Sequence, residues 1–168
     1  MKNNKETLII LAVTLAIFAG IIWVATPDKN SAGQESLVAS PSAVLVPENP
    51  EFNFGTISMA AGNVSHMYSV KNTGSEPVTI NTVYTSCMCT NATLVMGETR
   101  VGPFGMPGHG GFSQKLNRTV SPGEEFQVEG VFDPAAHGPA GVGPIERVIV
   151  LETSSGNVEM QFKAKVTP

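Results

Sequence analysis

After residue 43, apolar and polar residues alternate along much of the chain with a period of two. The clearest run covers residues 158–166, where five apolar residues alternate with glutamate, glutamine and lysine. This period is typical of a β-strand that buries one face. A second apolar run at 145–151 lies just before it, and Ser154, Ser155 and Gly156 separate the two runs. The pattern therefore predicts a C-terminal β-hairpin.

Further short apolar runs lie between clusters of turn residues, and none has a convincing helical period. Asn72-Thr73-Gly74 and Ser121-Pro122-Gly123 are two of these turn clusters. Seven or more strands at this spacing predict an all-β fold, a β-sandwich. The expected strands lie near residues 43–46, 52–57, 64–70, 77–84, 126–132, 145–151 and 158–166.

Two segments rich in glycine and proline are expected to be loops. Residues 102–111 (GPFGMPGHGG) contain five glycines and two prolines, and residues 133–144 (DPAAHGPAGVGP) contain three of each. Each segment carries one of the three histidines, His109 and His137. Loops of this composition are either mobile or allow the backbone to come close to another group.

The N-terminal region has a different pattern. From Leu8 to Thr26, sixteen of nineteen residues are apolar and none is charged. At about 1.5 Å per residue, a helix of this length spans roughly 28 Å, close to the hydrocarbon core of a bilayer. Lys2 and Lys5 favour a cytoplasmic N-terminus. The run is long for a signal peptide, and Trp23 lies where a cleavage site after Ala25 needs a small residue. An uncleaved anchor is therefore favoured over a cleaved signal.

These patterns divide the chain into four parts. A cytoplasmic stub (1–7) precedes the transmembrane anchor (8–26), and a flexible linker (27–42) leads to a single extracytoplasmic domain (43–168). We thus expect a single-pass membrane protein with one N-terminal transmembrane helix.

Composition and motifs limit the functional classes. The chain of 168 residues has a net charge of −4 and no basic stripe, which argues against nucleic acid as a partner. It contains no GxSxG, HExxH, Walker or Rossmann motif. We therefore expect a protein that is not an enzyme.

A series of short motifs is more specific in combination. Phe52-x-Phe54-Gly55-x-Ile57 is followed by Tyr68-x-Val70-Lys71-Asn72-Thr73-Gly74, Ser86-Cys87-Met88-Cys89-Thr90, Ser121-Pro122-Gly123 and Val131-Phe132-Asp133-Pro134. This order resembles the bacterial family called domain of unknown function 1573, which is related to Hydin-like immunoglobulin-type domains. Over residues 43–168, the resemblance implies an immunoglobulin-like β-sandwich of about seven to nine strands. It also implies a secreted or membrane-attached protein without established enzymatic activity. The usual cysteine motif of that family is SCGCT, so Met88 replaces its central glycine.

The two cysteines, Cys87 and Cys89, are the residues with the clearest chemical potential. In an extended strand their Cα atoms lie about 6.6 Å apart, near the upper limit for a disulfide, so a bond between them needs a bulge or a turn. Three fates compete outside the cytoplasm: a disulfide, a soft-metal site, or two buried small side chains. We expect a structural or oxidised pair.

Metal binding is the alternative. Two thiolates suit Cu(I) or Zn²⁺, and Met106 and His109 in the first glycine-rich loop are the candidates to complete the site. Met88 points to the opposite face of a regular strand. Thiol redox activity ranks third, because no lysine, arginine or histidine lies near the cysteines in the sequence. His66 is expected to be a residue at the edge of the core. His137 is expected to be a solvated residue or one that fixes its loop.

The expected function follows from these points. We expect a membrane-anchored, non-enzymatic interaction module that contacts another envelope protein through a sheet edge or the glycine-rich loops. Soft-metal binding (copper or zinc) is the second hypothesis, and thiol redox activity is the third.

Overall fold

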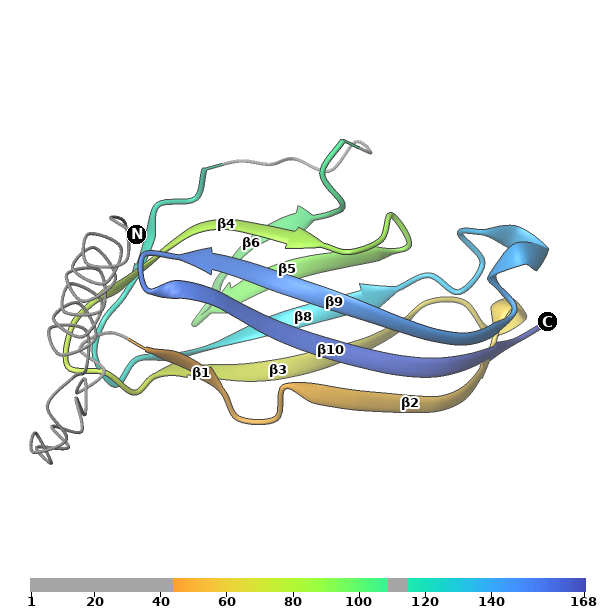
Figure 1. Ribbon diagram of the computed structural model, residues 1–168, viewed down its shortest axis with the longest axis horizontal. Helices are drawn as coiled ribbons and strands as arrows, with labels where there is room; N and C mark the ends of the chain where they lie inside the picture. The colour runs from red at the N-terminus through yellow and green to blue at the C-terminus, as the bar shows by residue number, and fades with distance from the viewer. Residues whose placement is uncertain (1–43, 109–114) are drawn as a thin grey trace, which may run out of the picture. The chain divides into compact units, whose positions relative to one another are not determined.

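Figure 1 shows a computed structural model of the protein, which describes residues 44–108 and 115–168. Within these ranges the chain forms ten strands and two short 3-10 helices. They are β1 (Leu45–Pro47), β2 (Glu51–Ser58), η1 (Met59–Ala61), β3 (Val64–Asn72), β4 (Val78–Thr85), β5 (Thr90–Met96), β6 (Thr99–Phe104), β7 (Arg118–Val120), β8 (Glu125–Phe132), η2 (Gly138–Gly141), β9 (Gly143–Thr153) and β10 (Gly156–Thr167).

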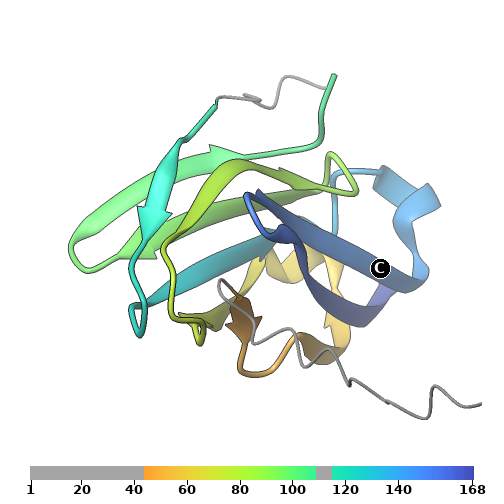
Figure 2. The ribbon, with the colours of Figure 1, turned by 60° about the vertical axis from the view of Figure 1, so that its left-hand side comes forward.

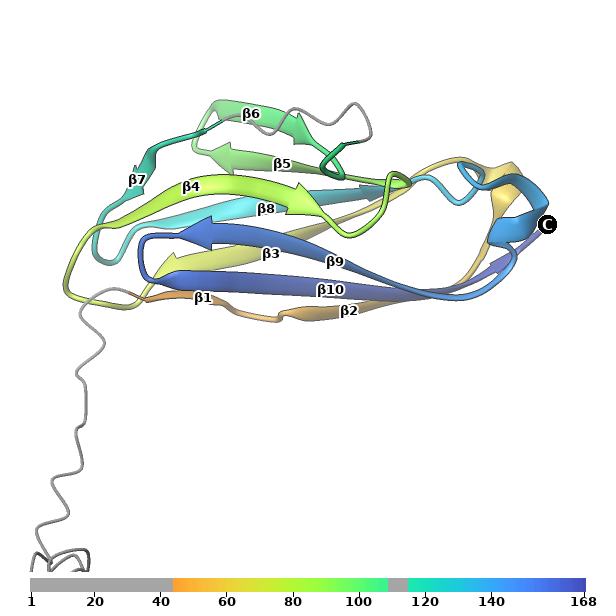
Figure 3. The ribbon, with the colours of Figure 1, turned by 45° about the horizontal axis from the view of Figure 1, so that its top comes forward.

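The strands form two five-stranded sheets, which Figure 3 shows as two layers. One sheet has the order β1-β3-β8-β5-β6 and the other has the order β2-β10-β9-β4-β7. Every pairing is antiparallel except that of β2 with β10. The all-β, two-sheet expectation is confirmed, with one strand more in the described ranges than the nine expected at most.

The alternating pattern correctly predicted the C-terminal hairpin. Strands β9 and β10 pair along their whole length, with Gly156 opposite Thr153 at the turn. Met160, Phe162 and Ala164 on β10 are buried, whereas the lysines between and after them are exposed. The apolar face of this hairpin therefore packs into the core, as the period of two requires.

The expectation that residues 102–111 and 133–144 form loops throughout is wrong at one end of each segment. Gly102, Pro103 and Phe104 complete β6, and Gly143 and Pro144 begin β9. A Cβ atom on Gly102 would lie 2.9 Å from the carbonyl oxygen of Ala92 on the paired strand, so the close approach of the strands requires glycine there. Pro103 is tolerated because β6 is an edge strand, which leaves one side of its backbone unpaired.

The turn after β3 is built around a buried amide, Asn72. Its Nδ2 donates to the carbonyl oxygens of Glu76 (2.9 Å) and Val120 (3.0 Å), and its Oδ1 accepts from the backbone N–H of Gly74 (3.0 Å). A buried amide with both ends satisfied fixes the turn and ties it to β7. This explains physically why an asparagine lies in the Lys71–Gly74 motif.

Three connections cross between the sheets at the end of the sandwich where the C-terminus lies, and two of them carry the residues that matter here. The turn from β4 to β5 carries the two cysteines, and the connection from β8 to β9 carries His137. Figures 1 and 2 both show these segments close to each other, at the end where the C-terminus lies. The topology therefore brings together residues that are about fifty positions apart in the sequence.

The expected stub (1–7), anchor (8–26) and linker (27–42) lie outside the described residues. Among the residues that are described, no helix has the length and apolar character needed to cross a membrane.

Candidate functional site

Cys87 and Cys89 form a disulfide on the turn between β4 and β5. The backbone N–H of Thr90 donates to the carbonyl oxygen of Cys87 (3.1 Å), which closes the turn. This curvature brings the two Cα atoms to 5.3 Å, well inside the range that a disulfide can bridge. The sequence spacing required a turn or bulge for this bond, and the chain supplies a turn.

The cysteine turn is held from both sheets. Ser86 exchanges two hydrogen bonds with Val148 of β9: its N–H donates to the Val148 carbonyl, and its hydroxyl accepts from the Val148 N–H, both at 2.9 Å. On the other side, the N–H of Asp133 donates to the carbonyl oxygen of Cys89 (2.9 Å). These contacts fix the backbone of the turn, so the sulfur atoms have a defined position relative to β8 and β9.

The two sulfur atoms differ in exposure. Cys89 is only 2% exposed and packs in a cluster with Phe132, Phe162 and Val166. Cys87 is partly exposed at the edge of that cluster. A reagent from solvent therefore reaches Cys87 first.

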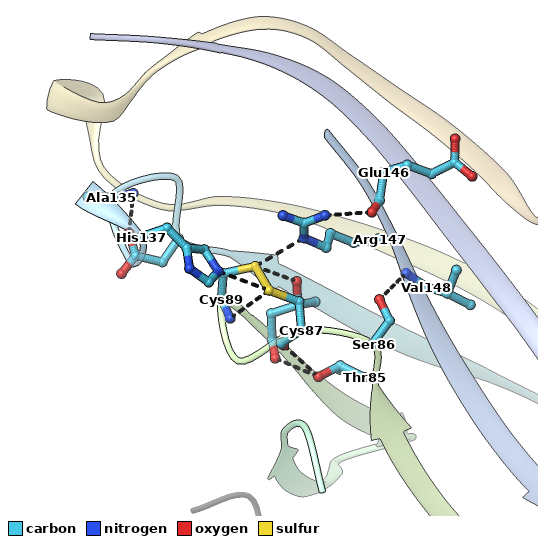
Figure 4. Close-up of a disulfide and its surroundings, with 11 residues drawn as sticks. Thr85, Ser86, Cys87, Cys89, Ala135, His137, Glu146, Arg147 and Val148 are labelled. Atoms are coloured by element: carbon cyan, nitrogen blue, oxygen red, sulfur yellow. Dashed lines mark hydrogen bonds between the residues drawn. A yellow bond between two sulfur atoms is a disulfide. The ribbon is translucent and has the colours of Figure 1, made fainter. Parts of the chain in front are cut away.

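Arg147 on β9 approaches the buried sulfur. Its Nε donates to Cys89 Sγ at 3.2 Å, and its Nη1 donates to the carbonyl oxygen of Glu146 at 2.8 Å. Figure 4 shows the guanidinium group directed at the disulfide from the β9 side. The positive charge thus lies against the sulfur that is most shielded from water.

His137 approaches the other sulfur. Its Nε2 lies 3.1 Å from Cys87 Sγ, on the solvent side of the site. The loop that carries it is ordered by an aspartate turn, in which Asp133 Oδ1 accepts from the N–H of Ala135 (2.8 Å). Gly138 follows with a φ of +55°, a conformation that glycine adopts without strain. The expectation of a solvated residue or one that fixes its loop did not include this contact with Cys87.

Three potential metal-binding atoms converge here. The Sγ atoms of Cys87 and Cys89 and a ring nitrogen of His137 all lie within 4.8 Å of one another. Met88, between the cysteines, is 52% exposed. Of the other candidates, His109 lies outside the described residues. Met106 is partly buried, next to Gly105, whose carbonyl accepts from the N–H of Thr85 (3.3 Å).

The sequence search missed His137 and Arg147 because they are 50 and 58 residues from the cysteines they contact. One signal was present for His137: it lies in a glycine- and proline-rich segment between two predicted strands, where the backbone can approach another group. Arg147 lies inside the run 145–151, and no local pattern distinguishes it from a solvated strand residue.

Part of the chain matches a known protein family. Residues 45–102 match the family described as "Protein of unknown function (DUF1573)". This DUF1573 segment covers β1 to most of β6 and includes the cysteine turn. The match supports the resemblance inferred from the sequence motifs of that region. Arg147 and His137 lie outside the matched segment. No curated protein matches the chain.

Among solved structures, the sandwich is similar to a protein of unknown function from Porphyromonas gingivalis W83. That match has a TM-score of 0.54 at 14% identity and covers 79% of this chain. The chain spans about half (51%) of the length of that protein. A PapD-like domain of human CEP192 also matches, with a TM-score of 0.43 at 13% identity over 76% of this chain and 87% of that domain. At such identities the likeness concerns the fold alone.

Proposed function

We propose that the sandwich is an extracytoplasmic thiol–disulfide exchange module, in which the Cys87–Cys89 disulfide accepts two electrons from the dithiol of a partner protein. The observation that carries this proposal is that each sulfur atom contacts a side chain that stabilises a thiolate. Arg147 contacts Cys89 Sγ at 3.2 Å, and His137 contacts Cys87 Sγ at 3.1 Å. Such neighbours mark reactive cysteines, whereas cysteines in apolar surroundings alone are inert.

Thiol redox activity, the third hypothesis from the sequence, therefore becomes the first. It ranked low because no lysine, arginine or histidine lies near Cys87 and Cys89 in the sequence and because the sequence has no thioredoxin-like βαβ pattern. The fold brings one such residue, Arg147, from β9 and a histidine from the β8–β9 connection. Cations beside a disulfide favour its reduced form, and a stabilised reduced form makes the pair a stronger oxidant.

The exchange proceeds in two balanced steps. First, a thiolate of the partner attacks the accessible sulfur of Cys87, the bond between Cys87 and Cys89 breaks, and its electron pair goes to Cys89 Sγ. That sulfur leaves as a thiolate beside the guanidinium of Arg147. The second partner thiol then attacks the partner's sulfur in the mixed disulfide and loses its proton to solvent. Cys87 is released, the partner holds a new disulfide, and the module holds two more electrons.

The asymmetry of the two sulfurs supports this direction of attack. Cys87 is the partly exposed member of the pair, and Cys89 is the buried one. The better leaving thiol is the one whose thiolate is stabilised, and the arginine contacts Cys89. The accessible Sγ atom of Cys87 is thus attacked, and the stabilised Sγ atom of Cys89 is the leaving group.

This function keeps the expected character of an interaction module. The site lies on the turn after β4 and faces the β8–β9 connection, which is one of the two glycine-rich segments expected to contact an envelope protein. We propose that the contact is made with a thiol-bearing protein. The module stores one electron pair at a time, so it is an electron-accepting partner and not an enzyme that turns over alone.

We further propose that the domain lies outside the cytoplasm, anchored by residues 8–26 with the N-terminus inside. The uncharged apolar run and the preceding lysines support this topology. The disulfide agrees with it, because disulfides persist mainly in oxidising compartments. In intact cells, a membrane-impermeant thiol reagent added after mild reduction is expected to label Cys87. Labelling only after the membrane is broken would overturn the topology.

The experiment that tests the exchange uses the full chain in a mild detergent. The oxidised protein is mixed, without oxygen, with a reduced dithiol peptide. Two thiols are expected to appear on the protein for each disulfide formed in the peptide. The control is the variant in which both cysteines are replaced by serine. Peptide oxidation no faster than with this control would overturn the proposal.

A further inference from the structure

We infer that the reduced form of this site binds one Cu(I) ion through Cys87 Sγ, Cys89 Sγ and His137 Nε2. The inference requires only that the disulfide can be reduced, and it does not depend on exchange with a protein partner. The cysteines were sequence candidates, but the third ligand was sought in Met106 and His109. The geometry instead points to a histidine from the β8–β9 connection.

The distances between the three ligand atoms suit a small metal ion once the two sulfur atoms have moved slightly apart. Three donors at about 2.0–2.3 Å from one metal ion lie about 3.5–4 Å apart. The three donor atoms here are already within 4.8 Å of one another, and His137 Nε2 lies 3.1 Å from Cys87 Sγ. Reduction breaks the bond between the sulfurs and lets them separate to the required spacing.

The donor set favours Cu(I) over Zn²⁺. Two thiolates and one imidazole are soft and borderline ligands, which both ions accept. Cu(I) is satisfied by three ligands, whereas Zn²⁺ in structural sites takes four. Within the described residues, the cluster of histidine, cysteine and carboxylate ligands at this site has three members.

The net charge of the complex is a second, independent reason to expect Cu(I). Cu(I) with two thiolates and a neutral imidazole carries a net charge of −1, and the guanidinium of Arg147 contacts Cys89 Sγ from the inner side. That cation balances the Cu(I) complex. The same arrangement with Zn²⁺ is already neutral, so Arg147 adds an uncompensated charge to a partly buried site, which is unfavourable.

A backbone N–H and a side-chain hydroxyl also lie beside the two sulfur atoms. The N–H of Cys89 points to Cys87 Sγ at 3.4 Å, and the hydroxyl of Thr90 lies 3.7 Å from Cys89 Sγ. Hydrogen bonds of this kind orient thiolate ligands and tune the metal that they bind. The site therefore combines ligand atoms from the cysteine turn and the β8–β9 connection, a charge partner from β9 and surrounding hydrogen bonds.

The test is a titration with Cu(I) alone, held by a competing chelator, on the full chain reduced with a phosphine and kept free of oxygen. One Cu(I) per chain is expected. Loss of an outer-sphere partner typically weakens metal binding by about 10–100-fold, so loss of a ligand in His137→Asn is expected to weaken it by at least about ten-fold. X-ray absorption is expected to show two sulfur ligands and one nitrogen ligand in the original chain and no histidine nitrogen in the variant.

His109→Asn is the matched control, because His109 was the ligand expected from the sequence. It is expected to bind Cu(I) as the original chain does. Equal affinity for the original chain and His137→Asn, or a loss confined to His109→Asn, would overturn the inference, as would tighter binding of Zn²⁺ than of Cu(I). Because the protein is reduced chemically beforehand, this result is independent of the dithiol-peptide test.

Discussion

The Nε atom of Arg147 lies 3.2 Å from the Sγ atom of Cys89, although 58 residues separate the two in the chain. One residue lies on β9 and the other ends the turn between β4 and β5. The paired hydrogen bonds between Ser86 and Val148 hold these two segments together. A positive charge therefore lies against the buried sulfur of the disulfide.

Replacing Arg147 by glutamine is expected to make the disulfide harder to reduce. The arginine stabilises the thiolate of the reduced form, and a hydrogen bond to a charged group at a partly exposed position is worth about 1–2 kcal/mol. Since 30 mV corresponds to about 1.4 kcal/mol for two electrons, the reduction potential should fall by about 20–40 mV. Equilibration with a thiol redox buffer measures this shift.

Arg147→Lys is the matched control, because it keeps the charge and loses the planar group. Its potential should lie between those of the original protein and the glutamine variant. A glutamine variant with an unchanged potential would show that the guanidinium does not act on the sulfur.

The two cysteines are expected to react at different rates once they are reduced. Cys89 is 2% exposed and Cys87 is partly exposed, so an alkylating reagent should modify Cys87 faster, on the order of ten-fold. Mass spectrometry of peptides from briefly labelled full chain gives the two rates. Equal labelling, or faster labelling of Cys89, would contradict the proposed direction of attack.

The same asymmetry makes a prediction for single-cysteine variants. Cys89→Ser leaves the accessible thiol and should form a lasting mixed disulfide when treated with an activated disulfide of a small peptide. Cys87→Ser leaves the buried thiol and should react much more slowly. Similar yields from both variants would contradict the assignment of Cys87 as the attacked sulfur.

His66 should make the stability of the fold depend on pH. It stacks on Phe52 with ring centroids 3.6 Å apart, and burial lowers its pKa below the ordinary value of 6.5. Between that lowered pKa and 6.5, the unfolded chain binds a proton that the folded chain does not, so the free energy of unfolding falls as the pH drops through this window.

His66→Phe keeps an aromatic ring beside Phe52 and removes the titration. The loss of stability between pH 7.5 and pH 5 should therefore be smaller in this variant than in the original protein, as measured by urea unfolding. Other titrating groups act alike in both proteins and cancel in the difference. An equal loss in both proteins would rule out this role of His66.

Asn72 is expected to be a large contributor to the stability of the fold. Its replacement by alanine removes the buried hydrogen bonds to Glu76, Val120 and Gly74 and leaves their backbone groups without these partners. The expected loss is about 2–4 kcal/mol by denaturant unfolding. Thr73→Ala, at the exposed neighbouring position, is the control and should change stability by less than about 0.5 kcal/mol.

Much of the fold could be predicted because burial of one face imposes a period of two. The runs around Tyr68, Phe126 and Phe162 alternate clearly, and all three residues are buried. Strands β5, β6 and β7 were not among the expected strands. The residues of β6 are held by pairing and by a close backbone approach at Gly102, which leaves no alternating signal.

The candidate site was only half predictable. The cysteines are two positions apart in the sequence, and this spacing alone showed that a disulfide needs a turn or a bulge. His137 reaches them on a connection that crosses between the two sheets, and Arg147 reaches them because β9 pairs with β4 in one sheet. A local sequence pattern does not predict those contacts.

The reduction potential of the Cys87–Cys89 pair in the full chain distinguishes an exchange-active disulfide from a structural one. Structural disulfides of secreted proteins have potentials below about −300 mV, whereas exchange-active disulfides lie above that value. Because Arg147 and His137 favour the reduced form, we expect a potential clearly above about −300 mV in equilibrium with a thiol redox buffer. A potential below that limit would identify the pair as a structural bond and rule out the proposed exchange.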